Sequence, residues 1–167
     1  MTILKALILV CIFGTALSSL AGDQPTVRVE PSDLQGPRPL QEQTAKAVVR
    51  DYLESWQSLS KALQQNRPDL LDRDFIGDAK EKLAGTIKEQ AAAGLRTVYH
   101  DRSHDVKILF YSPEWLSVVL SDTVEYDVNV MNQDNSLATK QIHTRYIVVL
   151  TPSEVRWRVR IFQAQVE

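Results

Sequence analysis

The chain has 167 residues, of which 24% are charged and 44% are hydrophobic, and its formal net charge at pH 7 is −2. This length is sufficient for one domain with a hydrophobic core of its own. Proteins that bind nucleic acids normally carry an excess of basic residues, so the charge balance argues against that class of function. The chain has a single cysteine, Cys11, which excludes an intramolecular disulfide bond.

Residues 1–21 have the pattern of an export signal. Lys5 supplies a positive charge, residues 6–17 form a short apolar run, and Ala21 ends a group of small residues suited to cleavage. A membrane span needs about 20 apolar residues, and this run is shorter. We therefore predict a cleaved signal and an exported protein, periplasmic or secreted. The alternative is an uncleaved anchor at residues 3–21, which would hold the protein at the inner membrane.

Residues 22–42 contain four of the seven prolines of the chain, set among polar residues. A segment of this composition cannot bury enough apolar surface to order itself, which predicts an extended, disordered linker. All of the predicted helices and strands fall in the remaining unit, residues 43–167, which we expect to form one folded domain.

Three helical segments open this domain. Apolar residues at helical spacing predict a long amphipathic helix over residues 44–65. Pro68 begins a short helical turn. Asp78 and Glu81 have the spacing of a capping box and predict another helix over residues 79–93.

From residue 98 onward, apolar and polar residues alternate, which is the period of a half-buried strand. Turns rich in polar residues or proline divide this part of the chain. The predicted strands are residues 98–111, 116–130, 137–150 and 154–163. Helices followed by an antiparallel meander indicate an α+β domain with the helices on one face of the sheet.

This order of elements, with Trp157, Arg158 and Phe162 in the last strand, resembles the nuclear transport factor 2-like superfamily, which includes the SnoaL-like proteins. The resemblance covers residues 44–167 and is architectural. It implies N-terminal helices packed on the concave face of a curved antiparallel sheet, forming a cone. The superfamily includes isomerase-like and cyclase-like enzymes as well as scaffold and ligand-binding domains without chemistry, so the resemblance alone does not assign a function.

The short turns also predict which residues face one another across the sheet. They place His104, Asp122 and Tyr146 in one row on the concave face. A buried carboxylate needs a partner, and we expect His104 to be the partner of Asp122. One hypothesis is a general acid–base pair in which Tyr146 donates to a substrate oxygen. The other is a structural hydrogen-bonded network. The adjoining rows predict the lining of a pocket: His100, Arg102, Tyr126 and Thr144.

No metal or cofactor site is predicted. His100 and His104 are four residues apart. That spacing brings two metal ligands together on a helix, whereas this segment is predicted to be a strand. The sequence also has no glycine-rich phosphate loop and no nucleophile elbow.

Four arginines are expected on the outer face of the sheet: Arg145, Arg156, Arg158 and Arg160. A solvated face is one interpretation. The other is an interaction surface for a second copy of the chain or for another protein, because arginine is enriched at interfaces.

Two functional hypotheses follow. The favoured one is an exported, non-enzymatic domain that binds a partner protein or a small apolar ligand. The alternative is a pocket enzyme of the isomerase, dehydratase or cyclase type that uses His104, Asp122 and Tyr146. Contact with a membrane is expected only if the signal remains uncleaved.

Overall fold

The computed structural model describes residues 24–31, 34, 40–112, 114 and 116–165. The predicted signal at residues 1–21 and the alternative anchor at residues 3–21 lie outside the described residues. Within the described part of the chain, no helix combines the length and the apolar character needed to cross a membrane.

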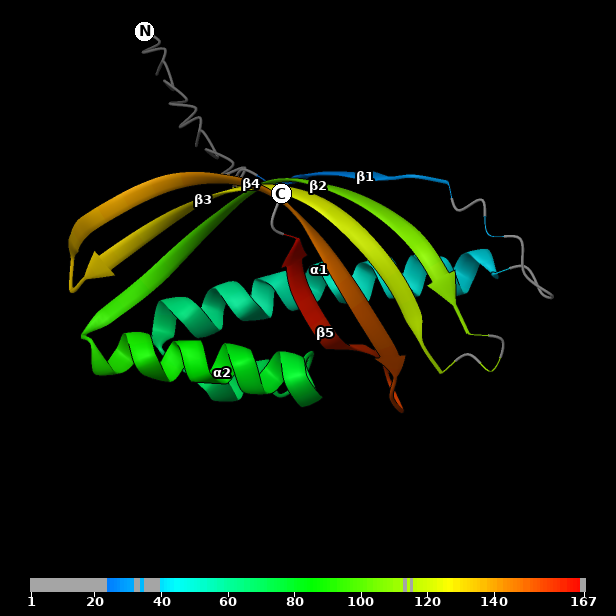
Figure 1. Cartoon of the computed structure of the whole chain (residues 1–167), viewed down its shortest axis with the longest axis horizontal. Coiled ribbons are helices and arrows are strands. Elements are labelled where there is room, and N and C mark those ends of the chain that lie inside the picture. The colour runs from blue at the N-terminus through cyan, green and yellow to red at the C-terminus, as the bar shows by residue number, and fades with distance from the viewer. Residues whose placement is uncertain (1–23, 32–33, 35–39, 113, 115, 166–167) are drawn as a thin grey trace, which may run out of the picture.

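A five-stranded sheet arches over two long helices (Figure 1). The strands are adjacent in chain order, with β1 parallel to β2 and every other pair antiparallel. The predicted α+β class is therefore confirmed. The elements are β1 (Thr26–Val29), α1 (Glu42–Gln65), the 3₁₀ helix η1 (Pro68–Leu71), α2 (Gly77–Ala92), β2 (Leu95–Tyr111), β3 (Val118–Asn132), β4 (Asn135–Pro152) and β5 (Trp157–Gln165).

Strand β1 lies inside the segment predicted to be a disordered linker. Its residues pair with residues 103–106 of β2, and the Glu30 amide donates to the Val106 carbonyl at 2.9 Å. The linker prediction is wrong for these residues. Composition indicates how much apolar surface a segment can bury, but not whether its backbone can pair with a neighbouring strand. Here the free edge of β2 supplies the backbone hydrogen-bond partners of β1.

The start of α2 also differs from the prediction. The helix begins at Gly77, and its N-cap residue, Ile76, makes no side-chain capping bond. The capping box of Asp78 and Glu81 is therefore not formed. The Ile76 amide donates to the carbonyl of Val159 at 2.9 Å, which holds Ile76 in an extended conformation and places the helix start directly after it.

The register between β3 and β4 agrees with the prediction, because Asp122 lies opposite Tyr146. Between β2 and β3 the register is shifted by two residues, so that Val106 lies opposite Asp122 and His104 opposite Val124. An even shift leaves every side chain on the face predicted for it. His104 and Asp122 are consequently both buried on the concave face.

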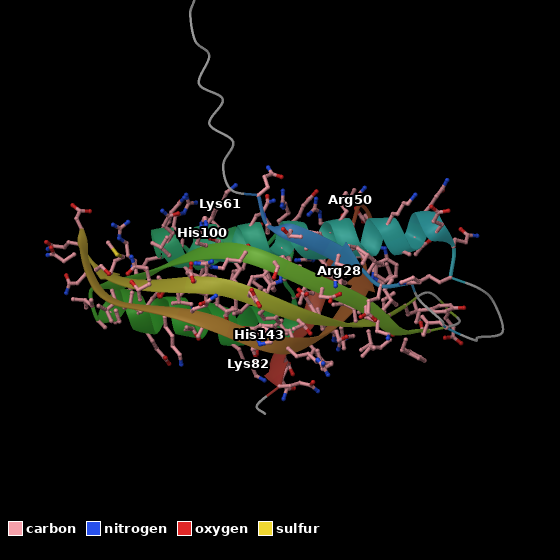
Figure 2. All side chains as sticks on the ribbon, turned by 90° about the horizontal axis from the view of Figure 1, so that it is seen from above. Arg28, Arg50, Lys61, Lys82, His100 and His143 are labelled. Atoms are coloured by element: carbon pink, nitrogen blue, oxygen red, sulfur yellow. The ribbon has the colours of Figure 1, made fainter. Side chains whose placement is uncertain are left out.

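A bulge between Asp101 and Ser103 reverses the faces beyond it. His100 and Arg102, predicted to line a pocket on the concave face, are exposed instead. His100 lies at the edge of the sheet (Figure 2). Asp101 takes the inward position and is partly buried.

The pairing of β4 with β5 differs from the register predicted from the short turn at residues 151–153. It is displaced by four residues at the turn and by a fifth at an irregularity between Val149 and Leu150. Val148 lies opposite Phe162, whereas the predicted register placed it opposite Trp157. Phe162 therefore packs against Trp56 of α1, with ring centroids 5.3 Å apart. Trp157 is half-buried at the start of β5 and packs at the margin of the core.

Candidate functional site

A buried hydrogen-bonded pair lies at the centre of the concave face. Nδ1 of His104 is 2.7 Å from Oδ2 of Asp122. The two residues are 2% and 0% exposed, so the pair is almost entirely removed from water. The structure thus brings together the two residues that sequence reasoning paired.

Helix α1 adds two residues to this network. The Tyr52 hydroxyl donates to Oδ2 of Asp122 at 2.8 Å, and Nε1 of Trp56 donates to the Tyr52 hydroxyl at 2.8 Å. The helical spacing of apolar residues predicts only that Tyr52 and Trp56 lie on the apolar face of the first helix. Their spacing of four residues places them on the same face of the helix, but no sequence pattern showed that their polar atoms meet Asp122.

Asp101 lies on the other side of the imidazole, with its Oδ2 4.0 Å from Nε2 of His104. Burial alone would lower the pKa of His104, but hydrogen bonding and charge from Asp101 and Asp122 outweigh it and raise the pKa to about 9. His104 is therefore an imidazolium at neutral pH. Burial, with the charge of Asp122, raises the pKa of Tyr52 well above its ordinary value.

Tyr146 does not complete the predicted constellation. Its hydroxyl is 3.0 Å from the hydroxyl of Tyr126, and its ring stacks on Phe162 with a centroid separation of 4.5 Å. The ring of Trp56 packs against the rings of both His104 and Tyr146, at 5.3 and 5.4 Å, and occupies the centre of the cone. The predicted row is therefore filled by aromatic packing.

Of the predicted pocket residues, Tyr126 contacts Tyr146, and Thr144 lies 3.5 Å from the carbonyl of Gln165 on β5. Arg102 forms an ion pair of 2.6 Å with Asp127. None of these predicted pocket residues lines either of the two cavities between α1 and β1.

The first cavity, of about 380 Å³, reaches His104 from the side of β1 and α1. Asp122 and Tyr146 do not line it. Its walls are formed by Gln24, Pro25, Val27, Leu53, Gln57, Asp101 and His104.

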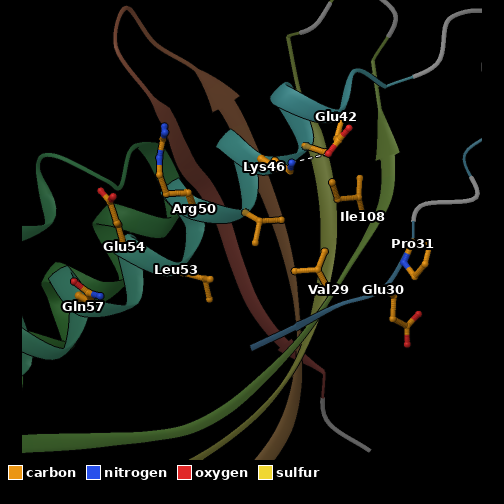
Figure 3. A pocket seen from close by; sticks show the side chains of 12 residues that line it. Val29, Glu30, Pro31, Glu42, Lys46, Arg50, Leu53, Glu54, Gln57 and Ile108 are labelled. Carbon is orange, nitrogen blue, oxygen red and sulfur yellow. Dashed lines mark ion pairs between the residues drawn. The ribbon is translucent and has the colours of Figure 1, made fainter. Parts of the chain in front are cut away.

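The second cavity is a larger groove of about 720 Å³ between the N-terminal half of α1 and the β1–β2 edge of the sheet. Figure 3 shows Val29 of β1 and Leu53 of α1 facing this space, with charged side chains around its rim. The apolar lining consists of Val29, Pro31, Ala45, Val49, Leu53 and Ile108. Leu53 and Gln57 line both cavities, so the two adjoin along α1.

No family model and no curated protein matches the chain. Among solved structures, the intermembrane-space region of the chloroplast protein ARC6 is similar, with a TM-score of 0.61 and 15% identity, covering 78% of this chain and 100% of that one. A candidate scytalone dehydratase from Novosphingobium aromaticivorans has a TM-score of 0.53 and 14% identity, covering 75% and 89%. The protein Kfla4162 from Kribbella flavida has a TM-score of 0.50 and 10% identity, covering 73% and 93%.

The chain has the nuclear transport factor 2-like fold. At these identities the likeness concerns the fold alone, and one fold supports many functions. The function must therefore be argued from the residues of this domain.

Two of the four predicted surface arginines point toward the helices. Arg156 forms ion pairs with the buried Asp74 and, at 3.1 Å, with Glu54. Arg158 donates to the Asp72 carbonyl at 2.5 Å. The prediction of an outward-facing stripe is wrong for Arg156 and Arg158.

The start of β5 explains why Arg156 and Arg158 do not face outward. The strand begins at Trp157, so Arg156 belongs to the preceding turn. The start of β5 also forms a parallel bridge between Val159 and Phe75, and this brings Arg158 to backbone carbonyls. Arg145 and Arg160 are exposed. Within the residues that the structure describes, no group of three or more His, Cys, Asp or Glu side chains is placed to hold a metal ion.

Proposed function

We propose that the chain is an exported, non-enzymatic domain that binds an apolar ligand in the groove between α1 and β1. The observation that carries this proposal is the groove of about 720 Å³, with its apolar floor and charged rim. Small-molecule sites in proteins are clefts of roughly 300–1,000 Å³ with mainly apolar linings and a few polar groups.

Exposed valines on β1 support the same proposal. Val27 and Val29 are 41% and 50% exposed, although they lie beside the core of the domain. They occupy alternate positions of β1, and Val27 lines the smaller cavity while Val29 lines the groove. A ligand between α1 and β1 would remove this apolar surface from water, at roughly 25 cal/mol per Å² buried.

The geometry around His104 favours binding over turnover. A general base needs a free lone pair within reach of a substrate proton. Nδ1 of His104 is engaged by Asp122, Nε2 faces Asp101, and the pKa of about 9, set by burial and by the two carboxylates, keeps both nitrogens protonated. The candidate donor Tyr146 is held by Tyr126 on the far side of Trp56.

Export is the second component of the proposal. It is supported by the signal-like pattern of residues 1–21. The similar region of ARC6 also lies outside a cytosol, in an intermembrane space. Contact with a membrane would require that the signal remain uncleaved. A protein partner or second copy on the outer face is less well supported, because Arg156 and Arg158 do not contribute to that face.

The neutral apolar dye N-phenylnaphthylamine tests the binding site. It should fluoresce on binding the full-length protein, and Ala45→Trp, which fills the groove from α1, should weaken binding by at least about tenfold. Ala91→Trp is the matched control, because Ala91 is exposed on α2. Equal dye binding by both variants, with unchanged circular dichroism, would contradict the proposed site.

A further inference from the structure

We propose that the groove accepts a cationic amphiphile, in which an apolar chain lies along α1 and a protonated primary amine ends against Asp101. This inference rests on the proposed function and specifies the chemical class of the ligand. Four observations lead to it: the shape of the site, the chemistry of its inner end, the net charge there and the pairing of the rim charges.

The site is long and changes in character along its length. Ala45, Val49, Leu53 and Gln57 are spaced by four residues and form one stripe on α1, and all four line the groove. From Ala45 to Gln57 the helix rises about 18 Å. Near Ala45 the floor of the groove is apolar and only its rim is charged, whereas the end near Gln57 opens into the smaller cavity with Asp101 and His104. An elongated molecule with one polar end matches this arrangement.

The inner end offers an acceptor without a donor. Oδ1 of Asp101 is buried, and no hydrogen-bond partner for this atom is present among the described residues. A buried carboxylate oxygen without a donor destabilises the folded protein. Asp101 lines the smaller cavity, so its carboxylate group forms part of the surface that a ligand entering from the groove would meet.

The charge at this end also selects a cation. Asp101 and Asp122 contribute two negative charges and His104 one positive charge, which leaves a net charge of −1. His104 cannot serve an anionic ligand, because both of its ring nitrogens face carboxylates. An ammonium group supplies both the missing charge and a hydrogen-bond donor for Asp101. A carboxylate at the same place would meet Asp101 without any donor.

The charges on the rim do not oppose this selection. Lys46 pairs with Glu42 at 2.6 Å, and Arg50 pairs with the buried Asp51 at 2.8 Å. These cations are already matched by acids on the same helix. Discrimination between ligands is therefore expected at Asp101 rather than at the rim.

The test is displacement of bound N-phenylnaphthylamine near pH 7 by dodecylamine, dodecanol and dodecanoate, which share one chain length and differ in the head group. We expect dodecylamine to displace the dye at a concentration at least about tenfold lower than dodecanoate, with dodecanol between them. Asp101→Asn should remove the preference for the amine and leave displacement by dodecanol unchanged.

Asp134→Asn is the matched control. It removes the same charge from an exposed residue in the β3–β4 turn, at the opposite end of the sheet from the start of α1 (Figure 1). Gln57→Lys gives a second variant that keeps Asp101 intact. Gln57 is exposed, so the fold should tolerate the change, and the new ammonium should compete with dodecylamine and favour dodecanoate.

Equal displacement by the three compounds, preference for dodecanoate, or an amine preference that survives Asp101→Asn would overturn the inference. In each of those cases the proposed function would still hold, provided that the unaltered protein binds the dye and Ala45→Trp weakens this binding. Failure of the dye to bind the unaltered protein would overturn both proposals.

Discussion

Tyr52 and Asp122 are 70 residues apart in the sequence, and the Tyr52 hydroxyl donates a hydrogen bond of 2.8 Å to Oδ2 of Asp122. The same oxygen accepts from Nδ1 of His104 at 2.7 Å. One carboxylate oxygen therefore joins α1, β2 and β3 in the centre of the cone.

Removing the Tyr52 hydroxyl should destabilise the domain. In Tyr52→Phe, Asp122 loses a donor and Nε1 of Trp56 loses its acceptor, so we expect the free energy of unfolding to fall by about 2–3 kcal/mol. Urea unfolding measures this loss. The control is Tyr146→Phe, which removes a bond between two neutral hydroxyls and should cost about 1 kcal/mol. A smaller loss in Tyr52→Phe than in Tyr146→Phe would contradict the importance of this network.

The stability of the domain should depend on pH through His104. Its pKa rises from 6.5 to about 9 in the folded protein, where hydrogen bonds and charge from Asp101 and Asp122 outweigh burial. The folded state therefore holds the proton more tightly than the unfolded chain. The resulting stabilisation, on the order of 3 kcal/mol, is complete below about pH 6.5 and is lost as the pH rises through about 9.

Urea unfolding measured at several pH values between about 6 and 9.5 checks this dependence. His104→Gln should lose most of the decline with rising pH, whatever its absolute stability. His143→Gln is the matched control, because His143 is exposed on β4, and this variant should keep the decline. The same slope in His104→Gln as in the unaltered protein would assign the pH dependence to other groups.

The shared face of His104 and Asp122 could be predicted, because it depends on the alternation of side chains along the strands and on the short turns between them. The β3–β4 turn set the predicted register of Asp122 against Tyr146, and the structure has that register. The β2–β3 register was two residues from its predicted value, but an even error preserves the face on which each side chain lies. His104 and Asp122 were thus placed on the same buried face.

The bulges could not be predicted in the same way. A single extra residue between Asp101 and Ser103 leaves the alternating pattern intact on each side, yet it reverses which residues point inward. Sequence reasoning consequently chose His100 and Arg102 for the pocket and missed Asp101. Contacts between distant elements were also missed, because the pattern that placed Tyr52 on the apolar face of a helix carries no information about its hydroxyl.

Export can be tested directly at the protein level. The signal-like residues 1–21 predict that the mature chain begins at Gly22 and is found outside the cytoplasm. Mass spectrometry of the protein from fractionated expressing cells measures both properties. Ala21→Arg is expected to block cleavage at this position, because the cleavage site requires small residues. An intact chain beginning at Met1 and recovered in the membrane fraction would instead support the anchor at residues 3–21.

Arg156 is expected to stabilise the fold rather than to form an interaction surface. Its guanidinium pairs with Asp74, which is 0% exposed, and with Glu54 of α1, so it joins the turn before β5 to the helices. In Arg156→Met, Asp74 keeps bonds from Arg73 and Ser58 but loses its least exposed cation. We expect a loss of about 2 kcal/mol, below the 3–5 kcal/mol typical of a buried charge left with no partner. Arg160→Met, at an exposed position of β5, should change stability by less than about 0.5 kcal/mol. Thermal and urea unfolding of the two variants measure this difference. Equal stability of both would contradict the structural role of Arg156 and support the surface role predicted from its sequence pattern.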